Sequence, residues 1–308
     1  DVARTIESLK QISPHDANRY SDFMKSFINI GRMLAPLLKM TPADLESLTL
    51  GDYWNFGKLG IKFRSLNKRD ASRLLRWTPM AVADLSNEWF ETSLLRALIE
   101  ARGIQGAFAG PRSAGTSVNL LIQSALTGSP ITPAAFVKGG MGALSNALAL
   151  SACKAGASIR TNTLVKHIKV KKNKVLGVCL DSGETLESPI VVSNADPQTT
   201  MLKLVSPEIL DPEFLLKIEN YRAKGSAAKV NLALSSLPAF LGADSGSLSG
   251  RIHIGHDTDY LEQSFDAAKY GEYSPSPYLD ITIPSISDPS LAPKGIFRIV
   301  SEFTSGFG

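Results

Sequence analysis

Residues 136–162, FVKGGMGALSNALALSACKAGASIRTN, indicate how this chain is built. Gly139 and Gly140 precede a run of apolar residues at helical spacing, and Gly156 suits the C-cap of that helix. An extended run begins directly afterwards. Glycines, helix and strand in this order are typical of a nucleotide-binding unit, but the spacing G-x-G-x-x-G occurs nowhere in the chain. The glycines therefore either lie against a cofactor or form a tight turn into the helix.

The residues that follow predict a β-hairpin and a third strand. Strands are expected at 164–170 and 175–180, joined by the turn KKNK, and a third strand at 186–192 after the turn DSGE. That strand ends at the corner SNADP. Ligands gather at such strand ends in open α/β sheets, so the Ser193–Ala195 backbone is expected to face a ligand. Asp196, directly before a proline, is expected to cap a helix.

The first third of the chain predicts helices. SPHD at Ser13 and TPAD at Thr41 both carry N-cap signals, a third helix is expected from RWTP to Gly103, and a fourth from near Thr116. Aromatic residues at helical spacing indicate helix packing. Residues 113–137 carry no charge, and Lys138 is the only charged residue from 113 to 153, which favours a path of this stretch through the interior or along an apolar cavity.

The last third predicts one helix at 211–221 and four strands, AAKVNLALS, RIHIGH, YLDITIPS and IFRIVSEF. Strands joined by turns without intervening helices indicate a largely antiparallel sheet. Residues 242–250, rich in Ser and Gly, predict a mobile loop. The expected fold class is therefore mixed α/β: helices, an antiparallel sheet and part of a nucleotide-binding unit with a hairpin insert.

Composition excludes several classes of function. Hydrophobic residues make up 44% and charged residues 20%, and the net charge of +4 is scattered, which argues against nucleic acid as a partner. Cys153 and Cys179 are too far apart for a CxxC motif. His253 and His256 would point to opposite faces of a strand, so no metal site is predicted. No G-x-S-x-G elbow is present to indicate a hydrolase.

Two motifs in the right order resemble a known family: KGGMGALSNALALSACKAGASIRTNTLVKHI and, after a hairpin, VVSNADPQTT. They are similar to the phytoene desaturase-like branch of FAD-dependent, amine oxidase-type flavoproteins. That resemblance implies three segments: a helical part of a substrate domain at 1–135, a segment of a Rossmann-like FAD domain at 136–200, and a sheet and helix of the substrate domain at 201–308.

The same resemblance implies cofactor-binding positions. The backbone of Val165 would meet the adenine, and Ser193, Asn194 and Ala195 would lie near the cofactor. The segment Gly139, Gly140 and Met141 would lie where the two domains meet. No residue is predicted to be catalytic, because Lys138, Arg160 and Asp196 are better explained as loop, surface and capping residues.

The family's amino-terminal G-x-G-x-x-G and carboxyl-terminal glycine-rich motif are missing from this sequence. We therefore expect a piece of a longer protein, cut at both ends, that binds FAD weakly or not at all by itself. The whole protein would pass hydride from an apolar small molecule to the flavin. A non-catalytic binding module that keeps the fold is the alternative. Peripheral contact with a membrane is included among the expected partners, and the expected compartment is the cytoplasm or the mitochondrial matrix.

Overall fold

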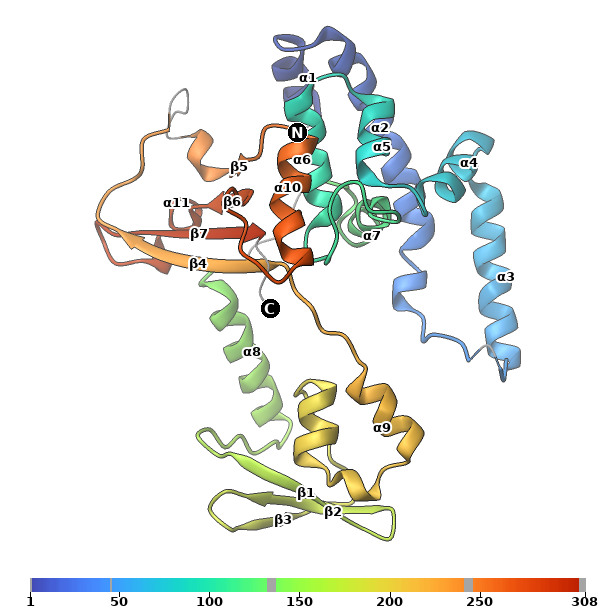
Figure 1. The fold of residues 1–308 in the computed structure, drawn as a ribbon, viewed down its shortest axis with the longest axis vertical. Coiled ribbons are helices and arrows are strands. Elements are labelled where there is room, and N and C mark those ends of the chain that lie inside the picture. The colour runs from blue at the N-terminus through green and yellow to red at the C-terminus, as the bar shows by residue number, and fades with distance from the viewer. Residues whose placement is uncertain (1, 45, 132–136, 241–245, 305–308) are drawn as a thin grey trace. The chain divides into compact units, whose positions relative to one another are not determined.

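The computed structural model describes residues 2–44, 46–131, 137–240 and 246–304. The chain divides into two compact units, unit 1 (Asp1–Gly140 with Lys224–Gly308) and unit 2 (Met141–Ala223). Both contain helices and an antiparallel sheet (Figure 1), which confirms the mixed α/β class. The division expected between flavin and substrate segments, at 136–200, stays a prediction about function.

Unit 1 is built mainly from helices. They are α1 (Val2–Lys10), α2 (Pro14–Leu34), α3 (Leu50–Ser65), α4 (Lys68–Trp77), α5 (Val82–Trp89), α6 (Ser93–Ile104), α7 (Ser117–Thr127), α10 (Thr258–Lys269) and α11 (Pro284–Ser287). Short 3-10 turns lie at η1 (Leu37–Lys39), η4 (Ser247–Ser249) and η5 (Pro289–Leu291). α10 was not predicted from the sequence, although Asp257 caps it by accepting a hydrogen bond from the Tyr260 N–H at 2.8 Å.

The core of unit 1 is aromatic. Phe27 of α2 stacks on Trp77 of α4 with ring centroids 4.7 Å apart, and Phe23 contacts the rings of Trp89 and Phe90 edge-on. All five side chains are buried. Burial of a side chain of this size contributes about 1.5 to 3 kcal/mol, so this cluster joins α2, α4 and α5. The expectation that these aromatics pack helices together is confirmed.

Helices α2 and α7 cross closely at Gly31. A Cβ atom at this position would lie 2.7 Å from the backbone of Ser124, so only glycine fits there. The Ser124 hydroxyl donates to the Phe27 carbonyl at 2.7 Å, and Leu120 and Leu121 are fully buried beside it. The stretch therefore runs through the interior along α7, as one of its two interpretations expected, but this interpretation is wrong for α8 (Gly140–Lys154), none of whose residues is buried. Residues 132–136 of that stretch lie outside the described residues.

Two of the helix predictions are wrong in detail. TPAD at Thr41 starts no helix, because α3 begins at Leu50, where Thr49 and Asp52 form a complete capping box. The helix expected from RWTP to Gly103 is two helices, interrupted at an extended Phe90 (φ −132°, ψ 145°). The start at Ser13 is confirmed, since its hydroxyl accepts the Asp16 N–H at 3.1 Å.

The sheet of unit 1 has four antiparallel strands in the order β4-β7-β6-β5 (Figure 1). They are β4 (Ala227–Leu234), β5 (Arg251–Ile254), β6 (Leu279–Thr282) and β7 (Phe297–Thr304). β4 and β7 pair along their whole length, from Ala227↔Thr304 to Leu234↔Phe297. All four predicted strands and their antiparallel arrangement are confirmed. Of the predicted loop at 242–250, residues 247–249 form a 3-10 turn, while 242–245 lie outside the described residues.

Unit 2 contains a three-stranded sheet, a small helical group and α8, except for the first residue of that helix, Gly140, which belongs to unit 1. Figure 1 shows the sheet facing the short helices of the same unit. The elements are α8 (Gly140–Lys154), β1 (Val165–Lys171), β2 (Lys174–Leu180), β3 (Thr185–Glu187), the π-helix η2 (Thr199–Leu204), the 3-10 turn η3 (Pro207–Ile209) and α9 (Pro212–Glu219). The hairpin is confirmed, and its turn residues Lys172 and Asn173 have φ of 50° and 58°, as a tight hairpin turn requires.

The third strand of unit 2 is much shorter than predicted. β3 ends at Glu187, and 188–195 have no ladder partner among the described residues. Pro189 has no N–H to donate, and the Ser188 hydroxyl bonds the Ile190 carbonyl at 2.7 Å, which bends the chain away from β2. Residues 157–160 also join no strand. There Arg160 instead forms two hydrogen bonds with Glu184, at 2.7 and 3.0 Å.

Candidate functional site

The glycine pair forms a tight turn. Gly139 and Gly140 have φ of 79° and 77°, a conformation that favours glycine. The Gly139 N–H donates to Asp288 Oδ2 at 2.6 Å, and the Gly140 N–H donates to the Val137 carbonyl at 2.9 Å. Both donors are thus used within unit 1. Met141 is exposed and begins unit 2. The turn explains the glycines, and their contact with a cofactor stays a prediction.

Unit 2 contains the other predicted cofactor residues. Val165 is the first residue of β1 and lies opposite Leu180, with an irregular register just after it. η2 packs against β1, and the hydroxyls of Ser193 and Thr200 hydrogen-bond at 2.8 Å, which ties the Ser193–Ala195 bend to η2. The structure therefore brings the Val165 strand and this bend together in one compact unit.

The bend is open. Ser193, Asn194 and Ala195 are all exposed, and the neighbouring Val192 is 91% exposed. Among the hydrogen bonds of the described residues, none is donated by the main-chain N–H of Val192, Ser193 or Asn194. Unpaired N–H groups at a bend suit the polar and anionic groups of a nucleotide. The residues present therefore fit the adenosine side of a flavin cofactor.

Asp196 has the capping role that the sequence predicted. Its carboxylate accepts the Thr199 N–H at 2.8 Å, and its carbonyl accepts the Thr200 N–H at 2.9 Å. Hydrogen bonds from the side chain and backbone of Thr199 hold the pKa of Asp196 below its usual range. The charged carboxylate is thus engaged in the helix start, which leaves the preceding backbone free to face a ligand.

A buried charged cluster that sequence analysis missed lies on β5 and β6. Asp280, only 3% exposed, accepts hydrogen bonds from Arg102 of α6, from Arg251 at 3.1 Å and from His253 Nδ1 at 3.3 Å. Burial alone would raise the pKa of Asp280, but the His253 hydrogen bond and the two guanidinium charges lower it. The alternation RIHI places Arg251 and His253 on one face, which was the available signal, but the pairing of β5 with β6 was needed to find Asp280.

Glu100 of α6 is a second buried acid. Its Oε1 atom contacts the hydroxyls of Ser86 at 2.5 Å and Thr258 at 3.0 Å, while Oε2 has no partner among the described residues. Burial raises the pKa of Glu100 more than the hydrogen bonds from Ser86 and Thr258 lower it. The Ser86 hydroxyl also donates to the Ala83 carbonyl at 3.0 Å, so a protonated Glu100 can donate to Ser86. Burial therefore shifts the pKa of this carboxyl upward, toward the neutral form.

A cavity of about 560 Å³ lies beside Glu100 in unit 1. Its lining is charged and polar, with residues from α5, α6, the loop between α6 and α7, and the start of α10: Ala83, Asp84, Asn87, Ser93, Arg96, Arg112, Asp257, Thr258 and Asp259. A smaller one of about 220 Å³ lies between the η1 segment and α3. Neither cavity is lined by described residues of 113–137, so the expectation that this stretch lines an apolar cavity gains no support from them.

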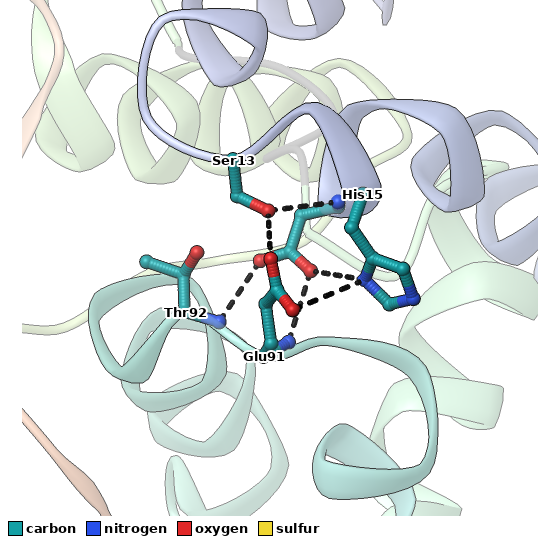
Figure 2. Close-up of polar contacts among 5 residues, drawn as sticks. Ser13, His15, Glu91 and Thr92 are labelled. Carbon is teal, nitrogen blue, oxygen red and sulfur yellow. Dashed lines mark hydrogen bonds and ion pairs between the residues drawn. The ribbon is translucent and has the colours of Figure 1, made fainter.

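His15, Asp16 and Glu91 form a group with the spacing of metal ligands (Figure 2). Asp16 already accepts the N–H groups of Glu91 at 2.9 Å and Thr92 at 3.0 Å, and the Ser13 hydroxyl donates to Glu91 at 2.7 Å. Burial would raise the pKa of Asp16, but the hydrogen bonds that it accepts outweigh burial and lower it. The group ties the start of α2 to the α5–α6 break, and we assign it this structural role.

Comparison with known proteins decides the family. The model of the flavin containing amine oxidoreductases matches residues 63–278, which include parts of both units. The chain belongs to this family. The resemblance to amine oxidase-type flavoproteins is therefore confirmed, and membership of this family implies a flavin cofactor.

Three relatives show how far the similarity extends. Pyridine nucleotide-disulfide oxidoreductase domain-containing protein 2 of Rattus norvegicus is 33% identical over 99% of this chain and 55% of its own length. All-trans-zeta-carotene desaturase of Myxococcus xanthus is 25% identical over 96% of this chain and 57% of its own. Phytoene desaturase (neurosporene-forming) of Cereibacter sphaeroides is 31% identical over 51% of this chain and 29% of its own length. The chain thus spans about half the length of the first two relatives.

Proposed function

We propose that the protein is an FAD-dependent oxidoreductase of the phytoene desaturase-like type, which removes hydride from an apolar small molecule. The observation that supports this most directly is the open Ser193–Ala195 bend, tied to η2 beside the Val165 strand, in a chain of a flavin-containing family. FAD, when bound, supplies the electron acceptor. The residues of this chain bind and orient it.

Main-chain atoms carry the proposed contacts. The backbone of Val165 meets the adenine, the free N–H groups of the bend meet the polar part of the adenosine, and Gly139–Gly140–Met141 lies on the path to the substrate domain. Such contacts need no particular side chain. A cofactor that performs the chemistry requires few acid–base groups from the protein, so the proposal assigns no catalytic residue in this chain.

An apolar substrate is supported by the relatives named for desaturation of phytoene and zeta-carotene. Within this chain, the uncharged stretch 113–137 and the β4–β7 sheet are proposed to orient it. The charged 560 Å³ cavity is assigned no part in this binding. The compartment is proposed to be the cytoplasm or the mitochondrial matrix, and nucleic acid is not a proposed partner. Fractionation with compartment markers tests that location.

Absorbance of the full-length protein, purified with and without added FAD, tests the cofactor. We expect the full-length protein to show a flavin spectrum and the 308-residue chain alone to retain none. Asn194→Pro removes one free N–H of the bend and should weaken FAD binding about fivefold to tenfold, since a hydrogen bond of this kind contributes about 1 to 1.5 kcal/mol.

Asn194→Ala is the matched control, because it removes only the side chain and should leave the dissociation constant nearly unchanged. Flavin fluorescence titration measures both variants, and circular dichroism checks that each is folded. A full-length protein that binds no flavin would instead support the non-catalytic binding module. Equal affinities for Asn194→Pro and Asn194→Ala would contradict the backbone contact.

A further inference from the structure

Helix α3 exposes an unusual set of side chains. None of its residues is buried, and it lies at the edge of the helical part of unit 1 (Figure 1). Leu50 is 89% exposed, Trp54 67% and Ile61 71%. Exposed apolar residues are ordinary when scattered singly, but here they recur at i, i+4 and i+11, so they form one stripe along the helix.

The stripe is distinct from the face by which α3 packs. Leu59 and Phe63 contact the core of unit 1, and helical geometry places them opposite Leu50, Trp54 and Ile61. The packing of α3 therefore leaves the stripe unused. A second apolar face on an exposed helix indicates a partner that unit 1 does not supply.

Positive charge borders the stripe. Lys58 and Lys62 lie on one side of it and Arg64 on the other, and the Lys58 ammonium lies 5.2 Å from the centre of the Trp54 ring. Among the described residues no ion pair neutralises these three cations. The carboxylate of Asp52, the acid within α3, is occupied at the helix start with Thr49 and lies on the packed face. The exposed side of α3 is thus both apolar and basic.

This combination selects the partner. In a symmetric dimer through the stripe, the same patch of each copy faces the other, so the cations of both copies would be brought together without counter-charges. An anionic bilayer surface pairs these cations and takes up the apolar side chains at the boundary of headgroups and acyl chains. Trp and Tyr are enriched at that boundary, and Trp54 and Tyr53 are both exposed.

We propose that α3 docks the protein on an anionic membrane surface, with Leu50, Trp54 and Ile61 inserted and with Lys58, Lys62 and Arg64 on the phosphates. No helix among the described residues has the length and apolar character needed to span a bilayer. This inference names the surface behind the expected membrane contact. It does not require the proposed oxidoreductase activity, because binding is measured without flavin.

Co-sedimentation of the full-length protein with phosphatidylcholine vesicles, with and without phosphatidylglycerol, tests the proposal. Binding should require phosphatidylglycerol and fall with added salt. Ile61→Asp should weaken it about tenfold or more, because a charge replaces an inserted apolar side chain. Each of Lys58→Gln and Lys62→Gln should weaken it about fivefold.

Leu126→Asp is the matched control: Leu126 of α7 is similarly exposed (66%), but lies outside the stripe, so binding should not change. Lipids with brominated acyl chains should quench a part of the tryptophan emission. That quenchable part should be absent in Trp54→Phe. Trp77 and Trp89 are buried and contribute no such difference. Thermal melts of all variants establish that they are folded.

Three outcomes would overturn the proposal. Equal vesicle binding by the wild-type protein and Ile61→Asp would remove the stripe from the contact. Equal binding to vesicles with and without phosphatidylglycerol would remove the role of the cations. A dimer in light scattering that Ile61→Asp dissociates, without vesicle binding, would assign the stripe to a second copy of the chain.

Discussion

Asp280→Asn should destabilise unit 1 strongly. The substitution keeps the shape of the side chain but removes the negative charge that faces Arg102 and Arg251. Arg102 is then left as a nearly buried cation without a counter-charge. Removing one partner of a buried ion pair costs about 3 to 5 kcal/mol, which is a large part of the stability of an ordinary domain.

Urea unfolding followed by circular dichroism measures this loss, and Asp259→Asn is its control. Asp259 also pairs with an arginine, Arg112, but both side chains are more than half exposed. Loss of such a pair should cost less than about 1 kcal/mol. The difference between the two variants therefore isolates the effect of burial on the same chemical change.

The pH dependence gives a second reading of the same prediction. The pKa of Asp280 is lowered in the folded protein, while in the unfolded chain it is about 3.9. The stabilisation is therefore complete above the unfolded value, and it is lost as the pH falls below about 4 toward the folded pKa. The difference in the free energy of unfolding between wild type and Asp280→Asn should be constant near neutral pH and should become smaller in acid. Equal losses for Asp280→Asn and Asp259→Asn, or a gap that does not narrow in acid, would refute the reasoning.

Three further predictions concern unit 1. Burial raises the pKa of Glu100, so its contribution to the free energy of unfolding should fall as the pH rises from the unfolded pKa of about 4.3 to the folded pKa, by up to about 1.4 kcal/mol per pH unit. Glu100→Gln should abolish that fall in urea titrations at several pH values. Gly31→Ala should cost about 1 to 3 kcal/mol in thermal melts, because a Cβ there overlaps the α7 backbone, whereas Gly57→Ala, which meets open space on α3, should stabilise by up to about 1 kcal/mol. Asp16→Ala leaves the N–H groups of Glu91 and Thr92 unpaired and should cost about 2 to 4 kcal/mol in urea unfolding.

Each of these has an outcome that contradicts it. A slope with pH that survives in Glu100→Gln would show that another group titrates. Similar changes in thermal stability for Gly31→Ala and Gly57→Ala would show that α2 and α7 can separate without a cost in free energy. Asp16→Asn keeps an acceptor for the two N–H groups and should cost less than Asp16→Ala, so equal losses would reject the hydrogen bonds as the cause.

The sequence by itself determined the elements whose signals are local. The cap at Ser13, the hairpin turn at Lys172–Asn173, the cap at Asp196 and the four strands of unit 1 all depend on residues within one turn or one alternation period. The family could be recognised for the same reason, because its motifs are contiguous. Where a prediction failed, a contact at long range or a single proline had overridden the local pattern. Asp16, distant in sequence, takes up the N–H groups at the α5–α6 break, and Pro189 ends β3 early.

Tertiary structure alone decided which residues lie together. Asp280 joins Arg102 and Arg251 only because β6 pairs with β5 and α6 packs nearby, and the pKa of Glu100 is raised only because folding removes its carboxyl from water. The stripe on α3 also required the fold: apolar residues surround this helix, and only packing shows that Leu59 and Phe63 are covered while Trp54 and Ile61 are not. Burial and long-range pairing depend on the whole chain at once, so no local pattern encodes them.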